Sequence, residues 1–486
     1  MMTLSTLFEG LEPAPVWAHF ATLCAIPRPS KGEGRLREHL LRWASARGLE
    51  TQVDAVGNLI LRKPASAGRE SAPGVVLQAH LDMVCQNNAD TLHDFLHDPI
   101  RPVVRDGWLL AENTTLGADN GIGVALALAA LEDDSLTHGP LEALLTVDEE
   151  SGMGGARGLA ADALQGHLLL NLDTEEWGQF YLGCAGGVDV NVRRTGAAEA
   201  PPVGGTAVRI DLRGLRGGHS GINIHEGRGN AIKLLVRMLR RIEDRWEMRL
   251  AALHGGTARN ALPREAFATV SLPASAVADL EVLLNEMQTE LRRELAGIDE
   301  GVSVSFAPCA IERVMSLAGQ RFWLDALQAA PHGVKGMSEE VPGIVETSNN
   351  LGVVDLGPDS GACNFMVRSL VDRSGVELAR EIASGFEQPG VFVEVDGHYP
   401  GWTPNPSSPL LALCRQVYRD TFGDEAATQV IHAGLECGLI GARYPGMDMI
   451  SFGPTIHGAH APGEAVELAS VERCWRLLVA ILARIE

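Results

Sequence analysis

The sequence lacks the features that mark several classes of protein. No stretch reaches the roughly 18 uninterrupted apolar residues of a membrane-spanning helix, so we expect no membrane span. Eight cysteines are spread along the chain without a CxxC pair, and in a long chain their even number is no evidence for disulfides. The N-terminal segment up to Gly10 contains Glu9 and no basic residue, which does not resemble a secretory signal. We therefore expect a reducing, cytoplasmic setting.

The sequence is also poor in basic residues. It has 40 Lys and Arg against 62 Asp and Glu, a formal net charge of −22, and no compact basic run. Nucleic acids and anionic membranes are polyanions, so a chain this acidic is a poor partner for either. The acidity itself has two explanations: a solvated surface, or, for some of the carboxylates, a cluster that binds cations.

The chain does have length and apolar content. Its 486 residues, of which 45% are hydrophobic, are enough for about two to four domains. In the first part, apolar runs typical of buried strands occur at Val75–His80, Leu141–Val147 and His167–Leu172, and an Ala/Leu-rich helix is predicted at Gly121–Leu131. This alternation of strand and helix predicts an α/β sheet flanked by helices.

The pattern changes near Ala185. Over residues 206–307 we predict strands and helices in the order β-α-β-β-α-β, the ferredoxin-like arrangement. A helix, two strands, a helix and a strand over residues 321–395 look like a second, partial copy. After a Pro-rich segment at Tyr399–Pro409, the α/β pattern returns and ends in a long helix at Val466–Ile485.

The simplest inference is that one domain is inserted into another. Residues 1–186 and 400–486 form a discontinuous α/β domain with helices on both faces of a mixed, largely parallel sheet. Residues 187–399 form an inserted α+β domain of one or two ferredoxin-like units. Two such units would let a monomer imitate the paired inserts of a dimer, and a homodimer stays open.

Ionisable side chains follow the predicted buried strands, at the point where each strand ends. Ligand sites of open α/β sheets lie beyond the carboxyl ends of the strands, so these groups are expected to converge. Asp119 joins them from just before the predicted Ala/Leu-rich helix. The set consists of His80, Asp82, Asp119, Glu149, Glu150 and Asp173.

So many ionisable groups in one place are costly unless their charge is compensated. A pair of metal ions would compensate it, and one imidazole with several carboxylates suits Zn²⁺, Mn²⁺ or Co²⁺. A second imidazole is missing from the N-terminal part. The Gly-rich loop at residues 452–464 offers two candidates, His457 and His460.

Each of these residues also has an ordinary structural explanation. An acidic residue at a strand end is usually a helix N-cap or a solvated loop residue, and Asp119 before Asn-Gly fits a turn. Glu149 and Glu150 fit an exposed pair, and His80 fits a core histidine. The combination, rather than any one residue, favours a site.

Four motifs resemble the di-zinc peptidase family that includes aminoacylase and glutamate carboxypeptidase. They are Ala79–Val84, Gly117–Gly123, Asp148–Gly155 and Gly458–His460. The resemblance extends over essentially the whole chain. It implies that residues 1–186 and 400–486 are a catalytic domain, and that the insert at 187–399 is a lid.

The resemblance implies a role for each residue of the metal site. Asp119 would bridge two metals, His80 and Asp173 would complete one site, and Glu150 and His460 would complete the other. The family pattern favours His460 over the neighbouring His457, which becomes a loop residue. Glu149 would be the general base, and Asp82 would orient His80 from behind.

The insert carries matching pieces too. His219, in the motif Arg-Gly-Gly-His-Ser-Gly, would donate to the developing oxyanion, from its own subunit or a neighbouring one; otherwise it lies in a Gly-rich turn. Asn260 would contact substrate. Arg368 would hold the free carboxylate of the peptide, unless it is an exposed surface arginine. Glu436, from the C-terminal part, would meet the substrate's amino group.

The implied function is that of a metal-dependent dipeptidase of broad specificity that includes Xaa-His dipeptides. It would act through a metal-bridged hydroxide, with two divalent metals, Zn²⁺ first and Co²⁺ or Mn²⁺ as alternatives. A tripeptidase or an N-acyl amino-acid deacylase of the same family is the alternative. A non-catalytic metal-binding or peptide-binding protein would require a lost base or ligand, and Glu149, Asp82 and all five ligands are present.

Overall fold

The computed structural model describes residues 7–88 and 90–486. Residues 1–6, which belong to the segment expected not to be a signal sequence, lie outside the described residues, as does Ala89. The chain divides into two compact units. Unit 1 comprises the chain up to Cys184, Trp402–Val430 and Leu435–Glu486, and unit 2 comprises Ala185–Gly401 and Ile431–Gly434. The inclusion of the short segment Ile431–Gly434 in unit 2 was not predicted, because no sequence pattern marks it.

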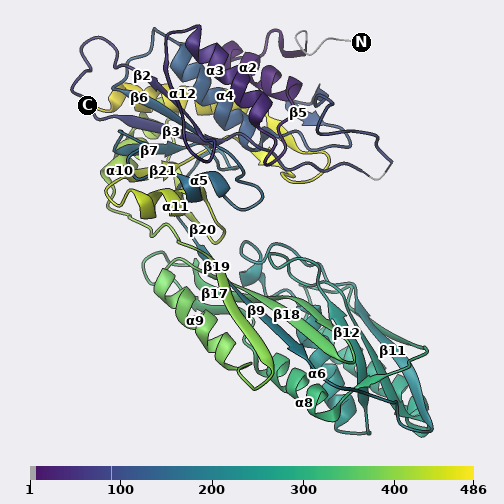
Figure 1. Ribbon diagram of the computed structural model, residues 1–486. Coiled ribbons are helices and arrows are strands. Elements are labelled where there is room, and N and C mark those ends of the chain that lie inside the picture. The colour runs from purple at the N-terminus through teal and green to yellow at the C-terminus, as the bar shows by residue number, and fades with distance from the viewer. Residues whose placement is uncertain (1–6, 89) are drawn as a thin grey trace. The chain divides into compact units, whose positions relative to one another are not determined.

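Unit 1 is built on an eight-stranded sheet with the order β1-β2-β6-β3-β7-β21-β8-β20 (Figure 1). The neighbours β6, β3, β7 and β21 are parallel, while β1·β2, β2·β6 and β21·β8 are antiparallel. The predicted α/β class with a mixed sheet is therefore confirmed. The strands are β1 Glu50–Val53, β2 Leu59–Lys63, β3 Val75–His80, β6 Leu141–Thr146, β7 Leu168–Asn171, β8 Gln179–Cys184, β20 Ala427–Ile431 and β21 Asp448–Ser451.

The parallel centre of this sheet is covered, which explains its apolar sequence. Every residue of β3 and β6 is buried, as expected for strands packed on both faces. Helix α4 is buried nearly all round because it packs against α2, β3 and β6. Figure 1 draws α2–α4 above β3 and α5 and α11 below it. The helices are α2 Ala14–Ala25, α3 Gly34–Ser45, α4 Ala118–Glu132, α5 Gly154–Gly158, α10 Pro409–Phe422, α11 Glu436–Arg443 and α12 Leu468–Arg484.

A separate four-stranded sheet in unit 1 has the order β22-β23-β5-β4. Its strands are β4 Pro102–Arg105, β5 Trp108–Ala111, β22 Ile456–His457 and β23 Ala465–Glu467. The short strands β22 and β23 pair with each other and hold residues 458–464 as the loop of a hairpin. This loop carries His460, so the hairpin determines the position of the His460 backbone.

Unit 2 contains a nine-stranded sheet with the order β14-β11-β13-β12-β17-β18-β9-β19, and β16 pairs with β17. The strands are β9 Gly186–Thr195, β11 Gly205–Arg213, β12 Arg249–Gly255, β13 Ala266–Pro273, β14 Ser303–Pro308, β16 Gly333–Met337, β17 Val345–Leu356, β18 Ser360–Ser369 and β19 Val391–Tyr399. The helices are α6 Ala231–Glu243, α7 Val277–Glu294, α8 Leu317–Ala329 and α9 Asp372–Ser384. The short strands β10 Ala198–Glu199 and β15 Val314–Met315 pair separately.

The large sheet of unit 2 consists of two β-α-β-β-α-β units. The first runs β11-α6-β12-β13-α7-β14, and the second runs β9-α8-β17-β18-α9-β19. In both, the strands lie in the spatial order fourth, first, third, second, and pairing of β12 with β17 joins the two units. The first unit is thus inserted after the first strand of the second unit. The second copy is complete, because β9 supplies the strand that seemed to be missing; its Gly186-Gly187 start reads as a loop signal.

Among residues 7–88 and 90–486, no helix has the length and hydrophobicity that crossing a lipid bilayer requires.

Candidate metal centre

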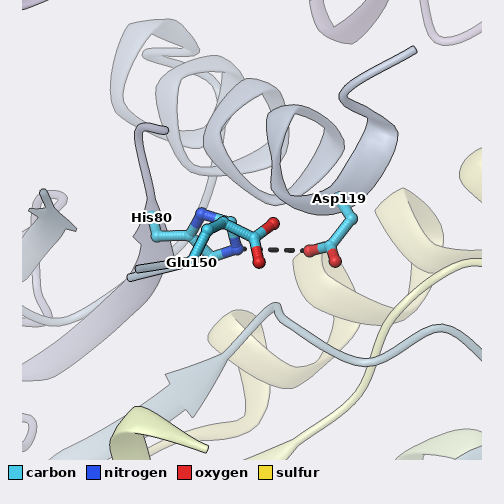
Figure 2. A group of neighbouring side chains, drawn as sticks. All are labelled: His80, Asp119 and Glu150. Atoms are coloured by element: carbon cyan, nitrogen blue, oxygen red, sulfur yellow. Dashed lines mark hydrogen bonds and ion pairs between the residues drawn. The ribbon is translucent and has the colours of Figure 1, made fainter. Parts of the chain in front are cut away.

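The candidate site of unit 1 lies where its parallel strands end. His80 is the last residue of β3, Glu149 and Glu150 follow β6, and Asp173 follows β7. Because β6, β3 and β7 run parallel, their carboxyl ends meet at one edge of the sheet. Asp119 comes to the same edge from the first turn of α4. Figure 2 shows the side chains of His80, Asp119 and Glu150 gathered there.

All five predicted metal ligands come together in two groups that share one carboxylate. His80 Nε2 lies 3.2 Å from Asp119 Oδ1 and 3.3 Å from Asp173 Oδ1. His460 Nε2 lies 3.1 Å from Asp119 Oδ2 and 3.1 Å from Glu150 Oε2. The ligand atoms of His80, Asp119 and Glu150 are within 4.8 Å of one another. Asp119 therefore stands between two imidazoles, with one oxygen toward each.

The donor set has an excess of negative charge that fits divalent cations. Burial raises the pKa of Asp173 to about 7, with His80 opposing the shift and Asp119 and Glu150 adding to it. Hydrogen bonds to Asp119 and Glu150 raise the pKa of His460 to about 11, so this position favours positive charge. Glu150 Oε1 is buried without a hydrogen-bond partner among the described residues. Imidazoles, carboxylates and a buried lone oxygen suit Zn²⁺ and its neighbours in the transition series.

Asp82 supports this arrangement from behind. Its carboxylate is fully buried and accepts the backbone N–H groups of Glu149 at 3.0 Å and Glu150 at 3.1 Å. The Ser30 hydroxyl donates to it at 2.7 Å, and His80 Nδ1 lies 3.5 Å from Oδ1. Burial opposes ionisation, but His80, Ser30 and the Glu149 N–H together lower the pKa of Asp82 to about 2. Asp82 thus contacts one ligand and fixes the backbone of another.

Glu149 lies beside this cluster without joining its ligand contacts. Burial raises the pKa of its carboxyl well above the usual range; the charge of His80 opposes this, while Asp173, Glu150 and Glu436 add to it. A carboxylate with a raised pKa accepts a proton more readily than an ordinary glutamate. Its neighbour Glu150, by contrast, contacts His460 directly.

Two charged residues that sequence reasoning missed hold the backbone of the site. Glu464 accepts four N–H groups from Leu116 to Asp119, and Arg28 donates to the carbonyls of Leu81 and Asp82 at 2.9 Å each and to that of Gly117. Both side chains are buried, at 2% exposure each. In the sequence, Glu464 is an acidic residue of the Gly-rich loop and cannot be distinguished from a solvated one.

Glu436 lies beneath the site in a buried polar layer. Its carboxylate accepts from Gln78 Nε2 at 2.6 Å and from Thr146 Oγ1 at 2.5 Å. Gln78 in turn bonds Asn171, and Ser451 bonds Asn171. Burial raises the pKa of Glu436 to about 8. The side chain has no exposed surface, so it could not contact a substrate in this conformation. The predicted contact with the substrate's amino group stays a prediction.

His457, the alternative to His460, lies on β22. Its ring stacks on that of Trp108, with ring centroids 4.6 Å apart. The imidazole of His460, in contrast, is half exposed and contacts Asp119 and Glu150. Within unit 1, it is therefore His460 that the hairpin loop brings to the carboxylates.

The predicted substrate residues of the insert form a second cluster, within unit 2. Arg368 on β18 is only 4% exposed, so it is no surface arginine. Its guanidinium donates to Tyr399 Oη at 2.9 Å and to Ser220 Oγ at 3.3 Å, and it lies 3.4 Å from His219 Nε2. These are neutral side chains, so the positive charge of Arg368 is not compensated by a carboxylate among them.

The backbone around His219 selects one tautomer of the imidazole. Nδ1 accepts the N–H groups of Gly221 and Ile222, both at 3.1 Å. The proton of the neutral ring is then on Nε2, which makes that nitrogen a donor, so the Arg368 guanidinium 3.4 Å away does not hydrogen-bond to it. Ser220 N donates to the carbonyl of Asn260 at 2.8 Å, so the segments that carry His219 and Asn260 lie side by side. Asn260 is exposed.

An α/β unit that gathers two histidines and several carboxylates beyond parallel strands has the architecture of a metal-dependent hydrolase. The model of Peptidase family M20/M25/M40 matches residues 76–484. The chain belongs to this family, and it is accordingly a hydrolase of the metallopeptidase type.

Relatives with known structures or functions match over nearly the full length. The chain is 45% identical over 476 residues to the cytosol non-specific dipeptidase of Escherichia coli (strain K12), covering 98% of each chain. The crystal structure of aminoacylhistidine dipeptidase from Vibrio alginolyticus has 44% identity and a TM-score of 0.87, over 99% of this chain and 98% of that one. Aminopeptidase PepT from Bacillus cereus ATCC 10987, at 16% identity and a TM-score of 0.58 over 98% of this chain and 99% of that one, shares the fold.

Proposed function

We propose that the protein is a metal-dependent dipeptidase. The observation that carries the proposal is the position of Asp119 between two ligand groups, with His80 on one side and His460 on the other. A carboxylate shared between two ligand groups, each with one imidazole, fits the site of a two-metal hydrolase. The name of the 45% identical relative supports dipeptides as substrates and the cytosol as the location.

In this proposal His80, Asp119 and Asp173 hold one divalent metal, and His460, Asp119 and Glu150 hold the other. The metal is Zn²⁺, with Co²⁺ and Mn²⁺ as alternatives that the same ligands accept. When bound, the metals polarise the scissile carbonyl and lower the pKa of a water molecule toward neutrality. Every remaining step depends on the chain's own residues.

Glu149 is the proton carrier of the reaction. Its raised pKa suits a group that takes a proton from the attacking water and gives it to the leaving amine. Asp82 acts on His80, whose Nδ1 it faces, and keeps the other ring nitrogen directed at Asp119. It also holds the backbone that carries Glu149 and Glu150.

The residues of unit 2 bind the peptide. Arg368 takes the free carboxylate, because its charge is buried against neutral partners. The Nε2–H group of His219 donates to the oxyanion of the tetrahedral intermediate, and the exposed Asn260 contacts substrate. An arginine that holds the terminal carboxylate next to the scissile bond selects the C-terminal peptide bond, which in a dipeptide is the only one. Xaa-His dipeptides are among the substrates by analogy with the name of the Vibrio relative.

The test is elemental analysis of the as-isolated protein combined with a substrate panel of dipeptides, tripeptides and N-acetyl amino acids. We expect two equivalents of divalent metal and hydrolysis of dipeptides, including Xaa-His, far above the other two groups. A preference for tripeptides or N-acetyl amino acids would replace the substrate assignment. Protein that binds no divalent metal, or binds it without hydrolysing any of the panel, would overturn the proposal.

A further inference from the structure

Glu464 makes an unusual set of contacts for a single side chain. Its Oε2 accepts the backbone N–H groups of Leu116 at 2.8 Å and Gly117 at 2.9 Å. Its Oε1 accepts those of Ala118 at 2.8 Å and Asp119 at 3.1 Å. The carboxylate is buried, and these four bonds are what replaces its hydration. Both of its oxygens are therefore committed to one short segment of backbone.

The two segments that Glu464 joins each carry a proposed metal ligand. Glu464 itself lies in the hairpin loop between β22 and β23, four residues after His460. The four N–H groups belong to the segment that leads into α4 and includes Asp119. Asp119 and His460 contact each other, with Nε2 and Oδ2 3.1 Å apart. The carboxylate thus ties together the backbones of two ligands that meet on the same side of the site.

The opposite side of the same segment is held by Arg28. Gly117 donates its N–H to Glu464, and its carbonyl accepts from Arg28. Arg28 also bonds the carbonyls of Leu81 and Asp82, next to His80. The contacts divide accordingly: Arg28 ties the Asp119 segment to the His80 side, and Glu464 ties it to the His460 side.

We propose that Glu464 is a positioning residue that holds Asp119 and His460 at ligand distance and thereby sets the affinity of the His460-side metal. The inference rests on the proposed two-metal site. Residues behind metal ligands commonly contribute about 10- to 100-fold to metal affinity. Glu464 acts on the ligand Asp119 through four backbone hydrogen bonds, which hold that segment more tightly than a single bond would.

The test compares Glu464→Gln with the wild-type protein. The amide keeps the size of the side chain but turns one oxygen into an NH₂ group, which faces N–H donors and cannot accept from them. Both proteins are equilibrated with buffered Zn²⁺, and bound metal is measured by elemental analysis. We expect Glu464→Gln to bind the His460-side Zn²⁺ about 10- to 100-fold more weakly and the other Zn²⁺ less weakened, because Arg28 still holds the Asp119 segment on the His80 side. Dipeptide hydrolysis should recover as free Zn²⁺ is raised.

A matched control is Glu467→Gln, three residues along. The Glu467 side chain is partly exposed and has one distant arginine contact, 3.7 Å from Arg473. The Glu467→Gln variant should therefore bind Zn²⁺ like the wild type. If Glu464→Gln is insoluble, Glu464→Asp keeps the charge but shortens the reach, and we expect a smaller loss of the same affinity.

Three results would overturn the inference. They are an unchanged Zn²⁺ affinity in Glu464→Gln, an equal weakening of both ions, and activity that stays lost at saturating Zn²⁺. A purely structural role would lower the melting temperature of the metal-free protein without separating the two affinities. The proposed function is tested separately, on the wild-type protein, which must bind two metals and hydrolyse dipeptides.

Discussion

The functional clusters of the two units have opposite electrostatic problems. In unit 1, carboxylates outnumber the cations around them: the pKa of Asp173 is raised to about 7, and one oxygen of Glu150 is buried with no hydrogen-bond partner among the described residues. In unit 2, Arg368 carries a buried positive charge whose hydrogen-bond contacts are neutral. The nearby Asp189 is bound instead by Arg259.

This difference indicates what each cluster is built to receive. Unit 1 is short of positive charge, which divalent metals supply. In the proposed function, a peptide carboxylate would supply the charged partner that the hydrogen-bond contacts of Arg368 in unit 2 lack. A buried charge left uncompensated is costly, and the proposed function compensates it in both clusters with a ligand: metal ions in unit 1 and a peptide carboxylate in unit 2. Variants that remove the function of one cluster and leave that of the other test this difference.

The largest effect is expected for Glu149→Ala. This change removes the proton carrier but none of the contacts between the proposed ligands, so kcat should fall about 10²- to 10⁴-fold while bound metal stays at the wild-type level. Metal content and dipeptide turnover are measured on the same sample. Glu176→Ala, an exposed carboxylate beyond β7, serves as the control.

Retained turnover in Glu149→Ala would end the assignment of the base. Metal loss in that variant, together with full metal content in Glu150→Ala, would mean that the two neighbouring glutamates have exchanged roles. Either result would change which carboxylates of unit 1 bind metal and which transfer protons.

The next effect belongs to unit 2. His219→Ala removes a donor to the oxyanion, so kcat should fall about 10²- to 10³-fold with little change in KM. His225→Ala, an exposed histidine of the same segment, is the control. Equal kcat values for His219→Ala and the wild type would contradict the assignment. Mixing His219→Ala with Glu149→Ala protein restores activity only if His219 acts on the site of another subunit.

The sequence predicts the unit 1 cluster well because its physical cause is local. An apolar run that ends in His80 or precedes Asp173 marks a buried strand and its carboxyl end. Parallel strands then bring those ends together without further information. Which carboxylate serves which metal came only from the family resemblance, since spacing alone leaves Glu149 and Glu150 equivalent.

The residues that the sequence could not supply act through distant contacts. Glu464 bonds backbone groups 345 to 348 positions away, and Arg28 reaches Gly117 across 89 positions. No local pattern marks such partners, because their targets are N–H and C=O groups that every residue has. The strand β9 was missed for a different reason: its opening Gly186-Gly187 looks like a loop, although Val188, Val190 and Val192 alternate into the core of unit 2.

A smaller effect is expected for Arg368→Ala, and it should depend on the substrate. Losing a charged hydrogen-bonding partner of the peptide carboxylate should lower kcat/KM for a dipeptide about 10- to 100-fold. A dipeptide amide has no carboxylate, so wild type and variant should hydrolyse it at similar rates. Arg368→Lys keeps the charge without the planar fork and should lie between them. Equal losses on the acid and the amide would show that Arg368 supports the fold of unit 2 instead.

The smallest effect tests how the positive charge of Arg368 is held. Tyr399→Phe keeps the ring but removes the hydroxyl that accepts from the guanidinium at 2.9 Å. A hydrogen bond to a charged group contributes about 1.5–3 kcal/mol, but Arg368 keeps its charge and its bond to Ser220, so KM for a dipeptide should rise by no more than about 10-fold while kcat changes little. In the proposed function the hydroxyl acts through Arg368, so the effect should vanish in an Arg368→Ala background. An effect of the same size in both backgrounds would mean that Tyr399 contacts the peptide itself, and that the carboxylate is shared between two donors.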